Sequence, residues 1–299
     1  MTTVSAPLVS VIIATYNWSS VLPYSIGSAL RQTFSDIEVL VVGDGCTDDS
    51  ESVVAGIADP RVRWINLEVN TGHQTGPNNE GLRQARGKYV AYLGHDDLWM
   101  PHHVSCLVAA LDAGADLAYG AVRYVRPPGD SNVVIAIPVP YFPGMWIPPS
   151  SVMHRHDYIK RIGGWQDHLK IHIDPDADMW LRIYEAGGSF AFVPRLTTIK
   201  LPASMRRDVY KVRPSHEQAD WFHRIQTEDD LEAIELTQMV ILAEQYKLAQ
   251  SGPRPYRTLC REFLSETVAR FQARFKALLR GQSLSRYLFE RRRRFKGLS

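Results

Sequence analysis

Two adjacent carboxylates, Asp96 and Asp97, follow an apolar run at residues 89–93 and are the first candidates for chemistry. The run is typical of a buried strand, and open α/β sheets bind ligands at the carboxyl ends of their strands. Carboxylate oxygens in that position suit Mg²⁺ or Mn²⁺. The neighbouring His95 is a weaker ligand for such cations, which favours a supporting role for it. The alternative is a solvated turn in which an aspartate caps the next helix.

A second acidic group precedes a helical pattern at residues 179–186 and consists of Asp174, Asp176 and Asp178. Asp176 and Asp178 fall on or just before the first turn of that helix, where the macrodipole favours negative charge. A functional carboxylate and an N-cap both fit this position. Spacing alone leaves the two interpretations equally open.

Alternating strands and helices must position these acids. Buried strands are predicted at residues 8–14, 37–42, 62–67 and 89–93, with helical segments between them. This alternation predicts an α/β fold with a doubly wound, mainly parallel sheet flanked by helices. The site should lie where the loops after Ala14, Val42 and Leu93 converge.

The 299-residue chain is 45% hydrophobic, which is enough for a proper core. Its three cysteines are widely spaced and form neither a zinc motif nor a disulfide framework, which favours a reduced, cytoplasmic setting. The N-terminus lacks a basic segment typical of signal peptides, and no run approaches the ~20 apolar residues of a membrane span. We therefore expect a cytoplasmic protein.

The C-terminal third is predicted to be helical, with helices from about residue 231, from about residue 254 and at 284–296. Residues 254–299 hold 13 Lys and Arg against three Asp and Glu, whereas the rest of the chain is net acidic. Such a tail fits an anionic membrane surface, or it packs on the main domain with its arginines in solvent. The acidic main domain argues against nucleic-acid binding.

Four segments in order resemble the inverting nucleotide-sugar glycosyltransferases of family 2, which have the GT-A fold. The segments are VSVIIATYN, IEVLVVGDGCTDDS, NTGHQTGPNNEGLRQARGKYVAYLGHDDLWMP and GGWQDHLKIHIDPDADMWLRIYEAGG, within residues 8–190. The resemblance implies a catalytic domain at 1–215, with a nucleotide-sugar half at about 1–120 and an acceptor half at about 121–215. A C-terminal helical extension with the basic tail would occupy 216–299.

The resemblance also implies roles for individual residues. Asp96 would be the direct metal ligand with Asp97 beside it, and Asp176 would be the catalytic base, with Asp174 and Asp178 as competitors. A base of this kind takes the proton of the acceptor hydroxyl while that oxygen attacks the anomeric carbon from the face opposite the leaving group. The implied substrate-binding residues are Thr15, Tyr16, Asn17, Asp44, Asn79, His95, Asp96, Gly164 and Trp165, and Trp165 has a core position as its alternative role.

Four positions depart from the family pattern, and each removes an expected charge: Gly43, Asn78, Gly94 and Pro175. The leading hypothesis remains an inverting, Mn²⁺- or Mg²⁺-dependent enzyme of glycan or polysaccharide biosynthesis. It would use a UDP-, GDP- or dTDP-linked donor and a saccharide or lipid-linked acceptor at the inner membrane face. The alternative is a nucleotide-sugar-binding protein that has lost catalysis. An oxidoreductase, suggested by Gly43 and Gly45, is disfavoured because the third glycine of the dinucleotide motif is absent.

Overall fold

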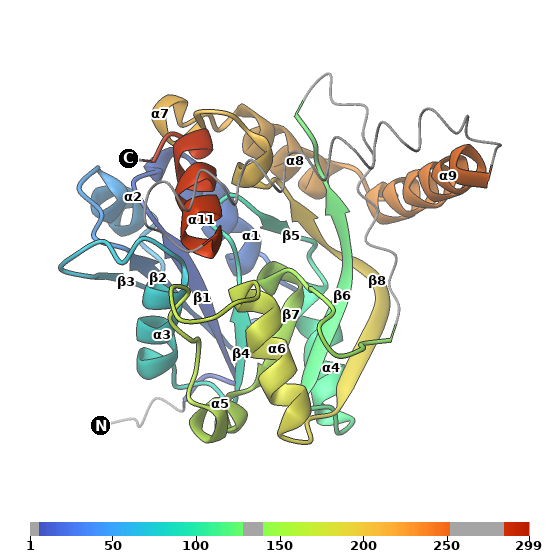
Figure 1. Ribbon diagram of the computed structural model, residues 1–299, viewed down its shortest axis with the longest axis horizontal. Helices are drawn as coiled ribbons and strands as arrows, with labels where there is room; N and C mark the ends of the chain where they lie inside the picture. The colour runs from blue at the N-terminus through green and yellow to red at the C-terminus, as the bar shows by residue number, and fades with distance from the viewer. Residues whose placement is uncertain (1–5, 128–139, 252–283, 299) are drawn as a thin grey trace.

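The computed structural model describes residues 6–127, 140–251 and 284–298, and one mixed sheet organises them (Figure 1). The strand order within these residues is β3-β2-β1-β4-β7-β6-β8-β5. The strands are β1 (Val9–Thr15), β2 (Ile37–Gly43), β3 (Val62–Asn66), β4 (Tyr89–Tyr92), β5 (Leu98–Trp99), β6 (Leu117–Tyr124), β7 (Val152–Arg155) and β8 (Phe190–Lys200). The predicted helix from about residue 254 lies outside the described residues.

The first four strands form the parallel part of the sheet that the sequence predicts. β1 pairs in parallel with β2 and β4, and β2 pairs in parallel with β3. β7 then runs antiparallel between β4 and β6, β8 lies parallel to β6, and β5 closes the edge antiparallel to β8. The predicted α/β fold is therefore confirmed. The sequence also predicts a strand near residues 117–119, where β6 begins, but it does not identify β5, β7 or β8. The carboxyl ends of β1, β2, β4 and β8 lie at the same edge.

Helices cover both faces of the sheet (Figure 1). In chain order they are α1 (Leu22–Leu30), α2 (Ser50–Gly56), α3 (Thr75–Gln84), α4 (His103–Asp112), α5 (His156–Ile162), α6 (Pro175–Glu185), α7 (Val209–Val212), α8 (His216–Thr227), α9 (Leu231–Ser251) and α11 (Leu284–Lys296), with short 3₁₀ turns at Ser19–Val21, Pro149–Ser151 and Ala203–Met205. None of the helices in the described ranges is long and apolar enough to cross a bilayer.

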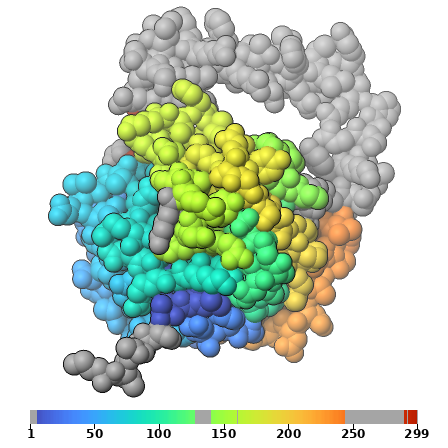
Figure 2. All heavy atoms as spheres, turned by 90° about the horizontal axis from the view of Figure 1, so that it is seen from below, coloured from blue at the N-terminus to red at the C-terminus, as the bar shows by residue number. Residues whose placement is uncertain are grey.

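The two hydrophobic cores follow from the alternation of side chains along each strand. In β1, Val11 and Ile13 face one side of the sheet and pack with residues of α1 and α4, whereas Ile12 faces the other side. There it packs with residues of α3, α5 and α6, including Trp180. Seen from below, segments far apart in the sequence pack side by side into one body (Figure 2).

A tight loop after α5 positions Trp165 in the second core. Gly163 and Gly164 both have positive φ angles, of 83° and 71°. The side chain of Asn79, in α3, holds the loop by donating to the carbonyl of Trp165 at 2.8 Å and accepting from its N–H at 2.9 Å. A Cβ at Gly164 would lie 2.7 Å from Asn79 Oδ1, while a Cβ at Gly163 would meet no atom within 4 Å.

Alanine substitutions at these glycines should therefore differ in cost. Gly163→Ala should lower the free energy of unfolding by about 1–2 kcal/mol, the cost of a left-handed backbone for a residue with a Cβ. Gly164→Ala should lower it by a further ~1 kcal/mol or more, because Asn79 must also leave its hydrogen bonds to Trp165. Urea unfolding of both variants measures the difference, and equal losses would contradict the close approach of Asn79.

Candidate active site

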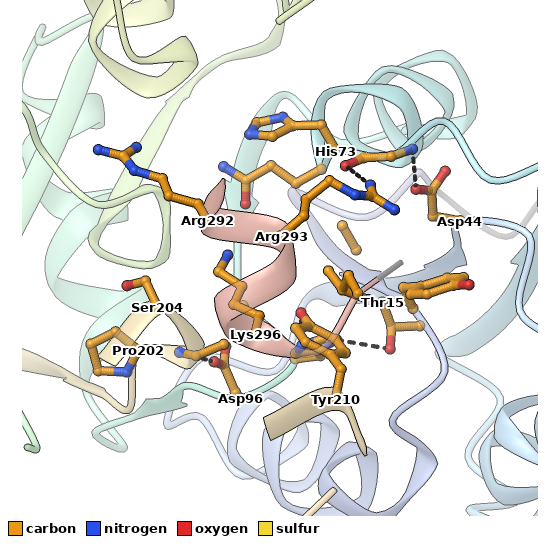
Figure 3. A pocket seen from close by; sticks show the side chains of 18 of the residues that line it. Thr15, Asp44, His73, Asp96, Pro202, Ser204, Tyr210, Arg292, Arg293 and Lys296 are labelled. Carbon is orange, nitrogen blue, oxygen red and sulfur yellow. Dashed lines mark hydrogen bonds between the residues drawn. The ribbon is translucent and has the colours of Figure 1, made fainter. Parts of the chain in front are cut away.

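A cavity of about 770 Å³ opens at the carboxyl ends of β1, β2, β4 and β8 (Figure 3). The start of α6 and one side of α11 complete its wall. Its lining includes several of the residues singled out in the sequence: Thr15, Tyr16, Asp44, His95, Asp96, Asp174 and Asp176. The convergence of the loops after the first, second and fourth strands is therefore as predicted.

Asp97 is fully buried and is directed into the protein rather than into the cavity. Its Oδ2 accepts hydrogen bonds from Lys200 Nζ at 2.7 Å and from Ser150 Oγ at 2.5 Å, and its Oδ1 accepts from the N–H of Leu201 at 3.0 Å. These bonds tie the turn after β4 to the end of β8. Because its oxygens are engaged in this way, Asp97 is better suited to holding the turn than to binding the metal predicted for it.

Asp96 lies on the other side of the same turn and lines the cavity. Its Oδ2 accepts a hydrogen bond from the N–H of Ala203 at 3.0 Å. Burial raises the pKa of Asp96, and the neighbouring Asp97 carboxylate raises it further, while His95 and Lys200 act in the opposite direction. A cation at Asp96 would therefore stabilise a carboxylate that the protein alone leaves partly uncompensated.

Gly94 occupies the position where the family pattern has an additional acid, and the structure explains the difference. A Cβ at Gly94 would lie 2.7 Å from Asp97 Oδ2 and 3.2 Å from Asp96 Oδ1. A third carboxylate at this position would crowd the two that are present. The turn therefore accommodates Asp96 and Asp97 in their observed positions only because residue 94 has no side chain.

His95 has a buried position between β1 and α7. Its Nδ1 lies 2.9 Å from Thr15 Oγ1 and its Nε2 lies 3.3 Å from the Tyr210 hydroxyl. Its ring also contacts Trp18 edge-on, at 5.3 Å between centroids. Burial lowers the pKa of His95, so the imidazole is favoured in its neutral form. These contacts agree with the supporting role favoured from the sequence.

Asp44 and Asn17 each organise a loop beside the cavity. Asp44 Oδ1 accepts from the N–H and hydroxyl of Thr71 at 2.8 and 2.7 Å, and Oδ2 accepts from the N–H of Gly72 at 3.1 Å. Asn17 Oδ1 accepts from the N–H of Thr47 at 2.7 Å. Asp44 still lines the cavity, whereas Asn17 does not.

Asp176 lines the cavity from the first turn of α6 and is 6% exposed. Gln74 Nε2 donates to its Oδ1 at 2.7 Å, and Trp146 Nε1 donates to its Oδ2 at 3.2 Å. Burial, with the nearby Asp174 carboxylate as the second cause, raises the pKa of Asp176 to about 8, although Lys200 and the two hydrogen bonds oppose the rise. A carboxylate with a pKa near the working pH is suited to general base catalysis.

The two competing acids have other partners. Asp174 is the N-cap of α6, where its Oδ1 accepts from the N–H of Asp176 at 3.1 Å, although it also lines the cavity. Asp178 lies outside the cavity lining, and its Oδ2 is 2.8 Å from Arg182 Nε. Asp174 is therefore the residue that caps α6. Of the three acids, Asp176 is the one that is both buried and part of the cavity lining.

Asn79, Gly164 and Trp165 lie away from the cavity lining. Trp165 is 3% exposed and packs edge-on against Tyr92, at 5.1 Å between centroids. Gly164 and Asn79 form the loop that holds it, as described above. The structure thus gives these three residues a packing function.

Several lining residues were not identified from the sequence: His73, Gln74, Trp146, Lys200, Tyr210, Arg292, Arg293 and Lys296. Lys200 ends β8, whose pattern is interrupted by Pro194 and by an irregularity in its pairing with β6. Trp146 lies within a proline-rich segment, residues 126–149, that carries no periodic signal. The basic pattern of α11 was evident, but only the fold shows that it meets the cavity.

The cavity lining offers a divalent cation few protein ligands. Within the described residues, no three His, Cys, Asp or Glu side chains are grouped to bind a metal. Mg²⁺ and Mn²⁺, however, are often held by one or two carboxylates together with substrate phosphates and water. Asp96 fits such a site as the single protein carboxylate.

Known proteins resemble the chain in both sequence and fold. Residues 10–160 match the family described as glycosyl transferase family 2. The *Escherichia coli* protein UDP-Glc:alpha-D-GlcNAc-diphosphoundecaprenol beta-1,3-glucosyltransferase WfaP is 37% identical over 98 residues, which cover 33% of this chain and 39% of the relative. Across several curated relatives the match spans only about a third of the relative's length, between 31% and 36%.

Two solved structures share the fold. *S. aureus* TarS in complex with UDP-GlcNAc has a TM-score of 0.56 at 20% identity, over 76% of this chain and 69% of that protein. Mannosyltransferase PcManGT from *Pyrobaculum calidifontis*, in complex with GDP-Man and Mn²⁺, has a TM-score of 0.53 at 18% identity, over 95% and 86%. These similarities confirm the GT-A fold, and with the family match over residues 10–160 they show that this chain belongs to glycosyl transferase family 2.

Proposed function

We propose that this chain is an inverting glycosyltransferase that moves a sugar from a nucleotide-sugar donor to a saccharide or lipid-linked acceptor. The observation that carries this proposal is that Asp96 and Asp176 line one cavity from different elements, the turn after β4 and the start of α6. Asp96 is suited to binding a cation that contacts the phosphates of the donor. Asp176, with its raised pKa, is suited to the acceptor side.

Asp176 would act as the general base. The acceptor hydroxyl is a weak nucleophile, and Asp176 would take its proton as the oxygen attacks the anomeric carbon from the face opposite the leaving diphosphate. Gln74 and Trp146 fix the orientation of the carboxylate through their hydrogen bonds.

Asp96 would hold the divalent cation together with the donor phosphates. A bound Mn²⁺ or Mg²⁺ would neutralise charge that develops on the leaving diphosphate. The ion pair between Asp97 and Lys200 would keep the turn in place when Asp96 binds the cation. The complex of PcManGT with GDP-Man and Mn²⁺, a protein of similar fold, supports the use of a divalent cation.

Donor and acceptor classes are supported by the relatives. TarS has been crystallised in complex with UDP-GlcNAc. The name of WfaP specifies a UDP-glucose donor and a diphosphoundecaprenol-linked acceptor. A lipid-linked acceptor would bring this protein to a membrane surface in glycan or polysaccharide biosynthesis.

Calorimetry with UDP, GDP and dTDP, with and without Mn²⁺, tests for a donor site, and binding of none of them would refute the proposal. Binding without any turnover would instead favour the degenerate binding protein.

The pH dependence of turnover should follow the ionisation of Asp176. A general base must be ionised, so a pKa of about 8 predicts that kcat/KM rises about tenfold per pH unit below pH 8 and then levels off. Asp176→Asn should lower kcat at least about a hundredfold. Asp178→Asn changes an acid on the same helix outside the cavity and should retain activity.

Asp174→Asn provides a finer test of the same assignment. It keeps a good N-cap but removes the neighbouring negative charge that raises the pKa of Asp176. The rising limb of the pH profile should therefore move to lower pH. An unmoved profile, or full activity in Asp176→Asn, would show that another group is the base.

Measurements of donor binding should distinguish the role of Asp96 from that of Asp176. In Asp96→Asn, the gain in UDP or GDP affinity produced by Mn²⁺ should fall at least about tenfold, because the protein ligand for the cation is lost. Asp176→Asn should bind the nucleotide nearly as the unaltered protein does. Calorimetry measures both, and an equal loss in the two variants would refute this division of roles.

A further inference from the structure

The C-terminal helix α11 forms one wall of the cavity and presents basic side chains to it (Figure 3). Arg292 and Lys296 are four residues apart and therefore lie on the same side of the helix. Both line the cavity, as does Arg293. The predicted basic tail thus faces the candidate active site at these positions.

The helix is docked by contacts that do not use Arg292 or Lys296. Arg293 Nη1 donates to the carbonyl of Gly72 at 2.7 Å, and the Phe289 ring lies 4.6 Å from the His168 ring between centroids. The carbonyl of Phe295 also accepts from the N–H of Asp208 at 2.9 Å. Arg293 and Phe289 both anchor α11 and line the cavity, whereas Arg292 and Lys296 line the cavity without taking part in these docking contacts.

The rest of the cavity lining is acidic, and a nucleoside diphosphate is an anion. The acids are Asp44, Asp96, Asp174 and Asp176. Among the described lining residues outside α11, Lys200 is the one Lys or Arg, and it is already paired with Asp97. Without α11, a diphosphate entering the cavity would meet acidic side chains and, among the described lining residues, no Lys or Arg other than the paired Lys200, an arrangement that does not favour an anion.

α11 leaves room for such a ligand. The volume of about 770 Å³ is that of the cavity with the helix in place, and small-molecule sites typically measure 300–1,000 Å³. Burial lowers the pKa of Lys296, while the Asp96 carboxylate favours its charged form. Lys296 therefore lies within the electrostatic reach of the residue assigned to the phosphate side.

We propose that Arg292 and Lys296 bind the diphosphate of the donor, so that α11 is part of the donor site. This inference rests on the proposed function. It also accounts for Asn78, the position at which the family pattern has an arginine, because α11 supplies positive charge that α3 lacks. The guanidinium and ammonium groups would donate charge-assisted hydrogen bonds to phosphate oxygens.

Calorimetry on the full chain tests this inference with UDP, GDP and inorganic diphosphate as ligands, each with and without Mn²⁺. Arg292→Ala and Lys296→Ala should each weaken nucleotide binding about tenfold or more, the loss expected for one charge-assisted hydrogen bond. The double variant should weaken binding of inorganic diphosphate as well. Arg292→Lys and Lys296→Arg should each recover part of the affinity.

Arg294→Ala is the matched control, since Arg294 is an exposed arginine of the same helix outside the cavity lining. It should bind all three ligands as the unaltered protein does. Unaltered nucleotide affinity in the double variant, or an equal loss in Arg294→Ala, would overturn the inference while leaving the proposed function intact. No binding of any nucleotide by the unaltered protein would overturn both.

Discussion

The ion pair between the fully buried Asp97 and the largely buried Lys200 is the interaction on which the site depends. It joins the turn after β4 to the end of β8, two elements more than 100 residues apart in the sequence, at 2.7 Å. Removing one member of a buried pair typically costs roughly 3–5 kcal/mol, because the other charge remains buried. Asp97 is fully buried, so the pair holds the turn rigidly and leaves the adjacent Asp96 to face the cavity. Adjacent carboxylates thus have different tasks because neighbouring residues in a turn point in different directions.

The balance of charge gives the cavity its proposed selectivity. Acids after β2, in the turn after β4 and at the start of α6 make the cavity suitable for a cation and for proton abstraction, but they do not favour an anionic donor. The proposed contribution of α11 resolves this conflict, because Arg292 and Lys296 bring positive charge from the end of the chain. The same arrangement would supply positive charge in a chain that has Asn78 where the family pattern has an arginine. The proposed catalytic carboxylates and the proposed phosphate-binding cations then belong to separate parts of the fold.

Local sequence patterns were sufficient to predict the parallel strands, the convergence of their loops and the helix that carries Asp176. Those features follow from side-chain periodicity and from acids at element ends. The patterns did not identify β8, because Pro194 interrupts it, or Lys200, because a single lysine at the end of a strand carries no distinctive signal. The resemblance implies Asp96 as the direct ligand, but the periodicity of the strand does not show that Asp97 is bound by Lys200 and Ser150. The contact between α11 and the cavity depends on tertiary packing between distant segments, which periodicity does not report.

The central proposal is that Asp96 binds the metal while Asp97 holds the turn. A crystal structure of the full chain with a nucleoside diphosphate and Mn²⁺ tests it most directly, with anomalous scattering used to locate the metal. We expect Mn²⁺ to bind an oxygen of Asp96 and the phosphates, while Asp97 stays on Lys200 and Ser150. A metal bound by Asp97, with its contact to Lys200 broken, would contradict the account.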